Sequence, residues 1–382
     1  MDLYTDIFHK IGYNTDASHL QQFNNVEIFL PQTKDEITKI VEHAIKEDKH
    51  IVCRGGGTNL VWNCLPREKA IIIDLSKLNH VIEIWGDYVD VEAWITNDCL
   101  NEKLGEIGKF FPVVLWSHSA AEIGWMIATN GAWMRAIKYW KMQDWVVELE
   151  VLYVDKEKKI KVERIIWNNC KEFLGAEWNF WIVLQARIKI IDLPGKSSME
   201  FKSFVSIQEA LDYVHSLKNE YNNIISALEI INPQVAEFLG YEKKYYVLAE
   251  FEDSSVGSIN DEIEMGKIWE RRDACYAVVI NAGYDQIEDP EIHNNEKEFF
   301  EWFEEKQIPI FWHIGIWVLH PHFKSEQIEE VKDMYVMVQK FWWKISWEHW
   351  IGKKKQEYLS NDQINSIHAL KEKWDFNNIF WF

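Results

Sequence analysis

Three consecutive glycines follow a short apolar run near the start of the chain. Residues 50–53 predict a buried strand, and Arg54-Gly55-Gly56-Gly57-Thr58-Asn59 comes directly after it. Consecutive glycines let successive backbone N–H groups point at one anion, because no Cβ atom blocks its approach. The pattern therefore predicts either a phosphate-binding loop at the end of a strand or a plain glycine turn, and the loop alone does not decide between them.

The segments around this loop alternate between strand and helix patterns. Thr33 and Glu36 have the spacing of a capping box, and the apolar residues that follow predict a helix over 34–47. Other strands are predicted at 26–30, 71–74, 88–92, 146–154, 182–191 and 245–251, and other helices at 206–218 and 325–341. The pattern of predicted strands and helices changes after Pro194-Gly195, which is the expected domain boundary.

Length and charge limit the class of protein. At about 150 residues per domain, 382 residues predict two domains or one large domain with a cap. A net charge of −20 makes nucleic acid and anionic membranes poor partners. No signal peptide or transmembrane segment is visible, and the 5 cysteines form no Cys-x-x-Cys pair. We therefore expect a reduced cytoplasmic protein.

Several short blocks occur in a fixed order along the chain, at 31–33, 54–59, 73–79, 111–112, 123–133 and 175–182. As an ordered series they resemble the vanillyl-alcohol-oxidase/para-cresol-methylhydroxylase (PCMH) family, in its D-lactate and D-2-hydroxyglutarate dehydrogenase branch, which includes glycolate-oxidase FAD subunits. The resemblance implies an α+β fold, with a PCMH-type FAD-binding domain of two subdomains over 1–194. An α+β, ferredoxin-like cap over 195–382 is expected to follow it.

The resemblance also implies which residues hold FAD. It places the pyrophosphate on the glycine loop, and the absence of a histidine there implies that FAD is bound non-covalently. The cofactor-binding residues that it implies are Arg54, Gly55, Gly56, Gly57, Thr58, Asn59, Pro112, Ser119, Gly124, Asn130, Gly131, Glu177 and Ile182.

Two histidines seven apart, His313 and His320, precede the pair Glu348-His349. Two imidazoles and a carboxylate are a common ligand set for zinc, although each histidine alone is more often a core or surface residue. On one continuous strand His313 and His320 would lie on opposite faces, so a shared metal requires a turn between them. The resemblance implies that His313, His320 and Glu348 bind a divalent metal, with zinc as the candidate, and that His349 is the catalytic base.

Other positions in the C-terminal half support or weaken this interpretation. Ile316 and Val318 stand where the family has Asp and Asn, which weakens a hydroxy-acid assignment. Arg272 matches the arginine of a family Trp-x-x-Arg motif and is the candidate for binding a substrate carboxylate. The alternative is that Arg272 is a surface helix charge paired with Glu270 or Asp273.

Tryptophan is unusually frequent, with 21 residues against 17 glycines. It stands where the family has glycine at Trp62, Trp94, Trp125, Trp133, Trp140, Trp178, Trp181, Trp312, Trp317, Trp342, Trp343, Trp347 and Trp350. Trp145, Trp269 and Trp302 are interpreted as true aromatic positions. The hypothesis is that an alternative genetic code reads the underlying codon as glycine; the alternative is a protein rich in tryptophan for packing or sugar binding.

Together these features predict an FAD-dependent dehydrogenase that oxidises a small D-2-hydroxy acid. Hydride would pass from the substrate Cα to flavin N5 while His349 removes the hydroxyl proton. The electron acceptor that reoxidises the flavin is unknown. Two alternatives stay open: a non-catalytic FAD-binding electron-transfer subunit, and a sugar-alcohol or lactone oxidase on the same fold.

Overall fold

A computed structural model describes residues 2–4, 11–18, 20–21, 25–66, 68–115, 117–177, 179–293, 296–341, 343–346, 349 and 351–380. The strands are β1 (Asp2–Tyr4), β2 (Glu27–Leu30), β3 (Ile51–Arg54), β4 (Ile71–Asp74), β5 (Val81–Trp85), β6 (Tyr88–Glu92), β7 (Lys109–Phe110), β8 (Val146–Val154), β9 (Ile160–Ile166), β10 (Ile182–Lys189), β11 (Ile191–Asp192), β12 (Ser198–Phe204), β13 (Ile225–Ile231), β14 (Tyr245–Phe251), β15 (Gln286–Ile287), β16 (Ile310–His313) and β17 (Val318–Phe323). The helices are α2 (Lys34–Glu47), α3 (Asn97–Gly105), α4 (Ile123–Ala128), α5 (Ala136–Tyr139), α6 (Ile207–Tyr221), α7 (Pro233–Phe238), α8 (Glu262–Asp273), α9 (Cys275–Asn281), α10 (Glu296–Glu305), α11 (Ile328–Lys340) and α12 (Asn361–Trp374), with 3₁₀ turns at Met142–Asp144, Trp167–Phe173 and Gln356–Tyr358.

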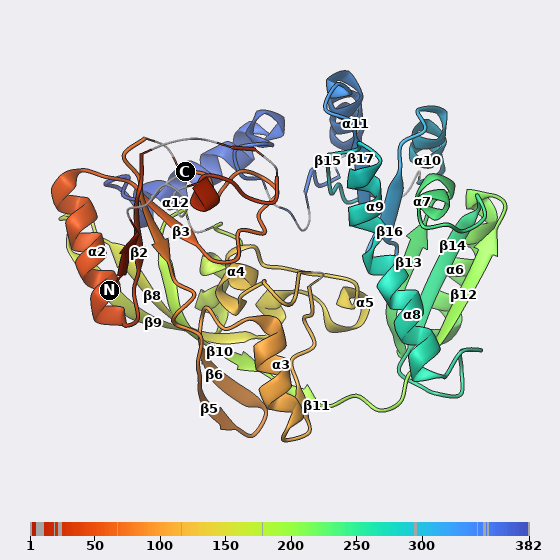
Figure 1. The fold of residues 1–382 in the computed structure, drawn as a ribbon, viewed down its shortest axis with the longest axis horizontal. Helices are drawn as coiled ribbons and strands as arrows, with labels where there is room; N and C mark the ends of the chain where they lie inside the picture. The colour runs from red at the N-terminus through yellow and green to blue at the C-terminus, as the bar shows by residue number, and fades with distance from the viewer. Residues whose placement is uncertain are drawn as a thin grey trace.

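The chain forms two lobes joined by an extended segment between β11 and β12 (Figure 1). The first lobe holds one sheet in the order β1-β2-β4-β3 and a second, antiparallel sheet in the order β5-β6-β10-β8-β9. In the first sheet, β2, β4 and β3 run parallel. The second lobe is built on an antiparallel sheet in the order β12-β14-β13-β16-β17-β15. The predicted α+β fold is confirmed.

Helix α2 shows how local sequence fixes the first lobe. Thr33 caps it by accepting a hydrogen bond from the N–H of Glu36 at 3.3 Å, as predicted. Its apolar stripe, which includes Ile37 and Ile40, shares one buried core with Ile71 and Ile73 of β4. The helix therefore covers the parallel sheet, whose strand β3 leads directly into the glycine loop.

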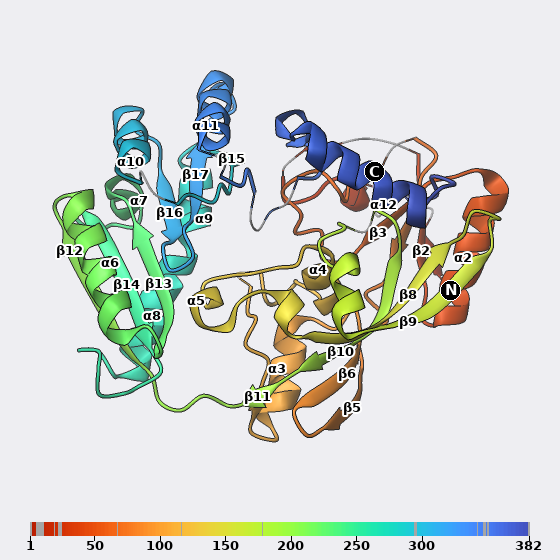
Figure 2. The ribbon, with the colours of Figure 1, turned by 180° about the vertical axis from the view of Figure 1, so that it is seen from behind.

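The last helix returns to the first lobe (Figure 2). Ile379 and Phe380, which follow α12, are buried in the core of the first lobe, and Phe380 forms a parallel β-bridge with Ile51 of β3. Trp374 donates from Nε1 to Glu172 at 2.8 Å. The sequence assigns the whole of 195–382 to the cap, whereas these contacts attach the segment 361–380 to the first lobe.

Several tryptophans have backbone conformations that suit glycine. Trp62, Trp140 and Trp317 have φ of 70°, 59° and 61°. Trp140 also has ψ of −150°, in a region that is essentially restricted to glycine, and its side chain is 69% exposed. All three belong to the positions where the sequence predicts glycine; Trp167 also has positive φ, of 51°, and is not one of those positions. Trp178, Trp342, Trp347 and Trp350 lie outside the described residues.

The variant Trp140→Gly should raise the free energy of unfolding by about 1–3 kcal/mol, because it removes backbone strain of that size and uncovers little buried surface. Chemical denaturation measures this change. Trp85→Gly is the control: Trp85 lies in β5 with its ring 5.1 Å from that of Tyr88, so its loss should destabilise the protein. Destabilisation by both variants would contradict the strain argument.

Candidate functional site

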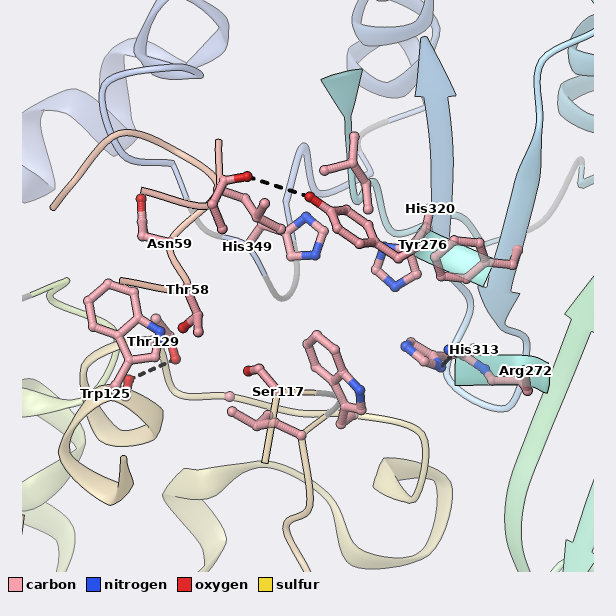
Figure 3. A pocket seen from close by; sticks show the side chains of 17 residues that line it. Thr58, Asn59, Ser117, Trp125, Thr129, Arg272, Tyr276, His313, His320 and His349 are labelled. Atoms are coloured by element: carbon pink, nitrogen blue, oxygen red, sulfur yellow. Dashed lines mark hydrogen bonds between the residues drawn. The ribbon is translucent and has the colours of Figure 1, made fainter. Parts of the chain in front are cut away.

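A cavity of about 140 Å³ lies between the two lobes, and both lobes line it (Figure 3). The first lobe contributes polar side chains and indoles around the glycine loop: Thr58, Asn59, Ser117, Trp125, Thr129 and Trp133, together with Gly131. The opposite wall carries nitrogen-bearing and aromatic side chains: Arg272, Tyr276, Phe311, His313, His320 and His349. The structure thus brings the end of the glycine loop and all three predicted functional histidines to one cavity.

The glycine loop turns tightly at the end of β3. A Cβ atom on Gly56 would lie 2.7 Å from the carbonyl oxygen of Ala120. Gly57 has φ of 68°, a left-handed conformation that L side chains rarely adopt. Both positions therefore require glycine, and they leave the backbone of the loop open to close approach.

A carboxylate is already bound to this loop. The N–H of Gly56 donates to Oε1 of Glu122 at 2.7 Å, and Glu122 is 5% exposed. Burial raises the pKa of Glu122 to about 7, with Asp74 adding to the rise and Arg54 opposing it. An anionic ligand of the loop would meet repulsion from Glu122 whenever this carboxyl group is ionised.

The remaining predicted cofactor residues serve other contacts. Arg54 donates to the carbonyl oxygens of Gly12 and Tyr13, at 3.2 and 3.4 Å. Asn130 exchanges hydrogen bonds with Gln143, at 2.9 and 3.0 Å. Pro112, Gly124 and Ile182 are buried, and Ser119 is exposed. Thr58, Asn59 and Gly131 are the predicted cofactor residues that line the cavity, within the part of the chain that the structure describes.

Glu177 ties the first lobe to the segment after His349. It accepts hydrogen bonds from the N–H groups of Ile351 and Gly352, at 3.1 and 2.9 Å, and it also contacts the side chain of Asn63. Burial raises its pKa to about 7. Its carboxylate therefore helps to place the segment that carries His349.

The hairpin β16–β17 supplies the turn that a shared site for His313 and His320 requires. His313 pairs with Val318 and Phe311 pairs with His320, so all four side chains lie on one face of the hairpin. The rings of His313 and His320 are 5.0 Å apart, and the ring of His349 lies 5.1 Å from that of His320. Trp317, at positive φ, sits in the turn where the sequence predicts glycine.

Burial keeps two of these imidazoles neutral. It lowers the pKa of His320 to about 4 and that of His349 to about 3. Both rings are therefore unprotonated at neutral pH, which leaves them able to bind a metal but makes each a weaker proton acceptor than a free imidazole. The pKa of His349 thus lies well below the ordinary histidine value near 6.5.

Arg272 belongs to a buried network and not to the helix surface. Its Nε donates to Oε2 of Glu229 at 2.9 Å, and its Nη2 also contacts Glu229. Nδ1 of His313 lies 2.8 Å from Oε1 of the same carboxylate. Burial raises the pKa of Glu229 to about 7, while Arg272 opposes that rise. The surface pairing of Arg272 with Glu270 or Asp273 is therefore not what holds it.

The proposed metal ligands are only partly described. Glu348 lies outside the described residues. Among the residues that the structure does describe, no group of three or more His, Cys, Asp or Glu side chains is arranged to hold a metal ion. His313 and His320 are thus neighbours, but a complete ligand set is not demonstrated.

The indoles of Trp125 and Trp133 line the cavity, and that of Trp133 lies beside the histidines. The ring of Trp133 lies 5.7, 6.4 and 6.5 Å from the rings of His313, His320 and His349. Its Nε1 is buried and has no hydrogen-bond partner among the described residues. Trp133 therefore fills the space that these three histidines share.

Sequence reasoning missed the buried acids of the site, Glu122, Glu229 and Asp289. Glu229 had a visible signal, because it is the charged residue in the otherwise apolar run of β13. Asp289 and Glu288 precede Pro290, and an acidic pair at a proline offers no comparable signal.

One family model and several known proteins are similar to this chain in sequence. A family model described as an FAD binding domain matches residues 27–159. The mitochondrial D-2-hydroxyglutarate dehydrogenase of Rattus norvegicus is 23% identical over 244 residues, covering 59% of this chain and 45% of its own length. A D-lactate dehydrogenase of Archaeoglobus fulgidus is 25% identical over 223 residues, covering 56% of this chain and 49% of its own. The chain thus spans about half the length of these curated relatives.

A solved structure supports the fold over the whole chain. An alkyldihydroxyacetonephosphate synthase superposes with a TM-score of 0.74 at 17% identity, covering 99% of this chain and 81% of its own. At this identity the likeness shows the fold alone. The chain therefore has a PCMH-type fold, matches an FAD binding domain over residues 27–159, and is similar in sequence to D-2-hydroxyglutarate and D-lactate dehydrogenases.

Proposed function

We propose that the protein is an FAD-dependent dehydrogenase that oxidises a small D-2-hydroxy acid to the 2-oxo acid. The observation that carries this proposal is the single cavity, in which Thr58 and Asn59 of the glycine loop face His313, His320 and His349. The relatives named above support the same chemistry. FAD, when bound, would accept the hydride that leaves the substrate Cα.

The residues of the chain would bind the substrate and remove its proton. His349, neutral at neutral pH, would take the hydroxyl proton on a ring nitrogen as the Cα–H bond breaks. Glu229 already engages Nε and Nη2 of Arg272, so a substrate carboxylate would bind through Nη1. Tyr276 lines the same wall and would limit the size of the substrate.

Anaerobic mixing of the FAD-loaded protein with D- and L-2-hydroxy acids tests this function. Bleaching of the flavin by D-2-hydroxy acids, and not by their L-isomers, is the expected result. If no hydroxy acid bleaches the flavin, the non-catalytic electron-transfer subunit is favoured. Ile316 and Val318, which stand where the family has Asp and Asn, also favour that alternative. Bleaching by sugar alcohols or lactones alone would favour a sugar-alcohol or lactone oxidase on the same fold.

We also propose that the FAD pyrophosphate binds the glycine loop and competes there with Glu122. Because burial raises the pKa of Glu122 to about 7, this group is mostly neutral at pH 6 and ionised at pH 8. FAD should therefore bind more tightly at pH 6. At pH 8, Glu122→Gln should lower the Kd for FAD by about tenfold or more, since one removed charge near a diphosphate exceeds about 1.4 kcal/mol. Titrations at both pH values check this, and an unchanged pH dependence in Glu122→Gln would contradict it.

A divalent metal, with zinc as the candidate, is proposed at His313, His320 and Glu348. Supporting this, the hairpin brings two imidazoles together, and Glu229 lies beside Nδ1 of His313, as outer carboxylates of metal-binding histidines do. Elemental analysis should find one metal per chain and little in His320→Ala. His322→Ala is the control, because His322 is a buried neighbour outside the cavity lining. If elemental analysis of the folded protein finds no divalent metal, the metal site is wrong.

The glycine hypothesis is likewise a proposal: the tryptophans named above are glycine in the native protein, through an alternative genetic code. The positive φ of Trp62, Trp140 and Trp317 supports it. Mass spectrometry of native peptides decides it, and a tryptophan mass at position 140 would overturn it.

Other expectations stay predictions. Among the described residues, no helix combines the length and apolarity needed to cross a membrane. Three further predictions stand beside this finding: a cytoplasmic location, a domain boundary at residue 194, and an electron acceptor of unknown identity.

A further inference from the structure

A cluster of buried charges lies directly behind His349. Asp289 and Lys355 are both 0% exposed and form an ion pair. Glu288, 1% exposed, accepts from Lys354 at 2.7 Å and lies 3.5 Å from Lys355. The hydroxyl group of Tyr335 also donates to Glu288. Two carboxylates thus face two ammonium groups inside the second lobe.

Asp289 connects this cluster to the cavity. The backbone N–H of His349 donates to its Oδ2 at 2.7 Å. The hydroxyl group of Ser346 lies 2.8 and 2.9 Å from the two carboxylate oxygens. Nδ1 of His349 lies 3.7 Å from Oδ1, just beyond hydrogen-bond distance. One carboxylate therefore binds both Ser346 and the backbone of His349, and it faces the ring of His349.

Glu288 offers an internal comparison. It is equally buried and contacts the same Lys355, yet its side-chain partners among the described residues are Tyr335, Lys354 and Lys355, and none of them lines the cavity. Burying charged pairs is costly, and apolar replacements are often as stable. Stability alone therefore does not explain why a carboxylate stands at position 289.

We propose that Asp289 is a positioning residue for His349. It fixes the backbone at His349, together with Ser346, and favours a proton on Nδ1 of the ring, which leaves Nε2 as the proton acceptor towards the cavity. Lys355 keeps the carboxylate charged. This inference rests on the proposed function, in which His349 takes the substrate proton.

Charge at Asp289 is consistent with this role. Burial tends to raise its pKa, but the neighbouring Lys355, together with His349, brings the pKa below the usual range. Asp289 therefore stays an acceptor and does not compete with His349 for the proton.

The first test compares Asp289→Asn with Glu288→Gln in the full, FAD-loaded protein. Both variants change one buried carboxylate of the cluster to an amide. Asp289→Asn should slow the limiting rate of anaerobic flavin reduction about tenfold or more, a part of the roughly 10²–10⁴-fold that a general base contributes, and leave half-saturation by substrate unchanged. Glu288→Gln should keep the rate. Equal slowing in both variants, matching their losses of thermal stability, would overturn the proposal.

The second test needs no turnover. Nitrogen NMR of ¹⁵N-histidine-labelled protein reports the ring tautomer of His349, assigned by its disappearance in His349→Gln. We expect the Nδ1–H form in the unaltered protein and in Glu288→Gln, and a mixture in Asp289→Asn. An unchanged His349 signal in Asp289→Asn would overturn the positioning role. Should no D-2-hydroxy acid reduce the flavin of the unaltered protein, the proposed function fails, and these spectra still decide what Asp289 does.

Discussion

A chain with glycine in place of Trp125 and Trp133 should bind FAD in a one-to-one ratio. Its Kd should be at least about 100-fold lower than that of the chain with both tryptophans, a difference of about 2.7 kcal/mol. The cavity of about 140 Å³ is smaller than the roughly 300–1,000 Å³ typical of ligand sites, and both indoles line it. Trp133 stands among the three histidines with its Nε1 buried and unbonded within the described chain, so its removal opens the reactive end.

Flavin absorbance retained after desalting measures this effect, with a thermal melt to show that each variant is folded. Trp145→Gly is the control, because Trp145 donates from Nε1 to the carbonyl oxygen of Tyr139 at 2.6 Å. That variant should lose stability and gain no FAD. If the double variant binds FAD no better than the chain with both tryptophans, these indoles do not block the site.

His349→Ala should slow anaerobic flavin reduction by at least about 100-fold while FAD stays bound. A secondary alcohol is too weak an acid to lose its proton unaided at neutral pH, so removal of the hydride requires a base in step with it. The His349 ring lines the cavity, and burial lowers its pKa to about 3, which keeps the ring unprotonated at neutral pH but makes it a weaker base than a free imidazole.

Stopped-flow absorbance gives the rate, and His322→Ala supplies a buried histidine outside the cavity lining as control. Because the pKa is lowered, the base is lost only as pH falls towards about 3, and the His349-dependent rate should be flat through the neutral range. Full-rate reduction in His349→Ala would show that His349 is not the base of the reaction.

The sequence predicts the local elements of this fold well, because their signals are short-range. The cap of α2 and its apolar stripe lie within one helix, and the turn between His313 and His320 follows from strand geometry. The strand 182–191 is interrupted, since β10 ends at Lys189 and the chain resumes pairing as β11.

Long-range partners could not be read in the same way. The contact of Glu122 with Gly56 and that of Asp289 with His349 join residues far apart in the chain, and neither acid belongs to a recognisable motif. The burial that lowers the pKa of His349 depends on packing from both lobes, so the sequence suggested only the unperturbed value.

The return of α12 to the first lobe has a consequence for synthesis of the protein. Ile51 of β3 meets Phe380 across a β-bridge, and the core beside it contains Ile379. An emerging chain can complete the second lobe while this edge of the first is still bare. The flavin-binding lobe therefore becomes whole only after the second lobe has been translated, and a nascent chain stalled before residue 379 would expose its apolar edge to chaperones.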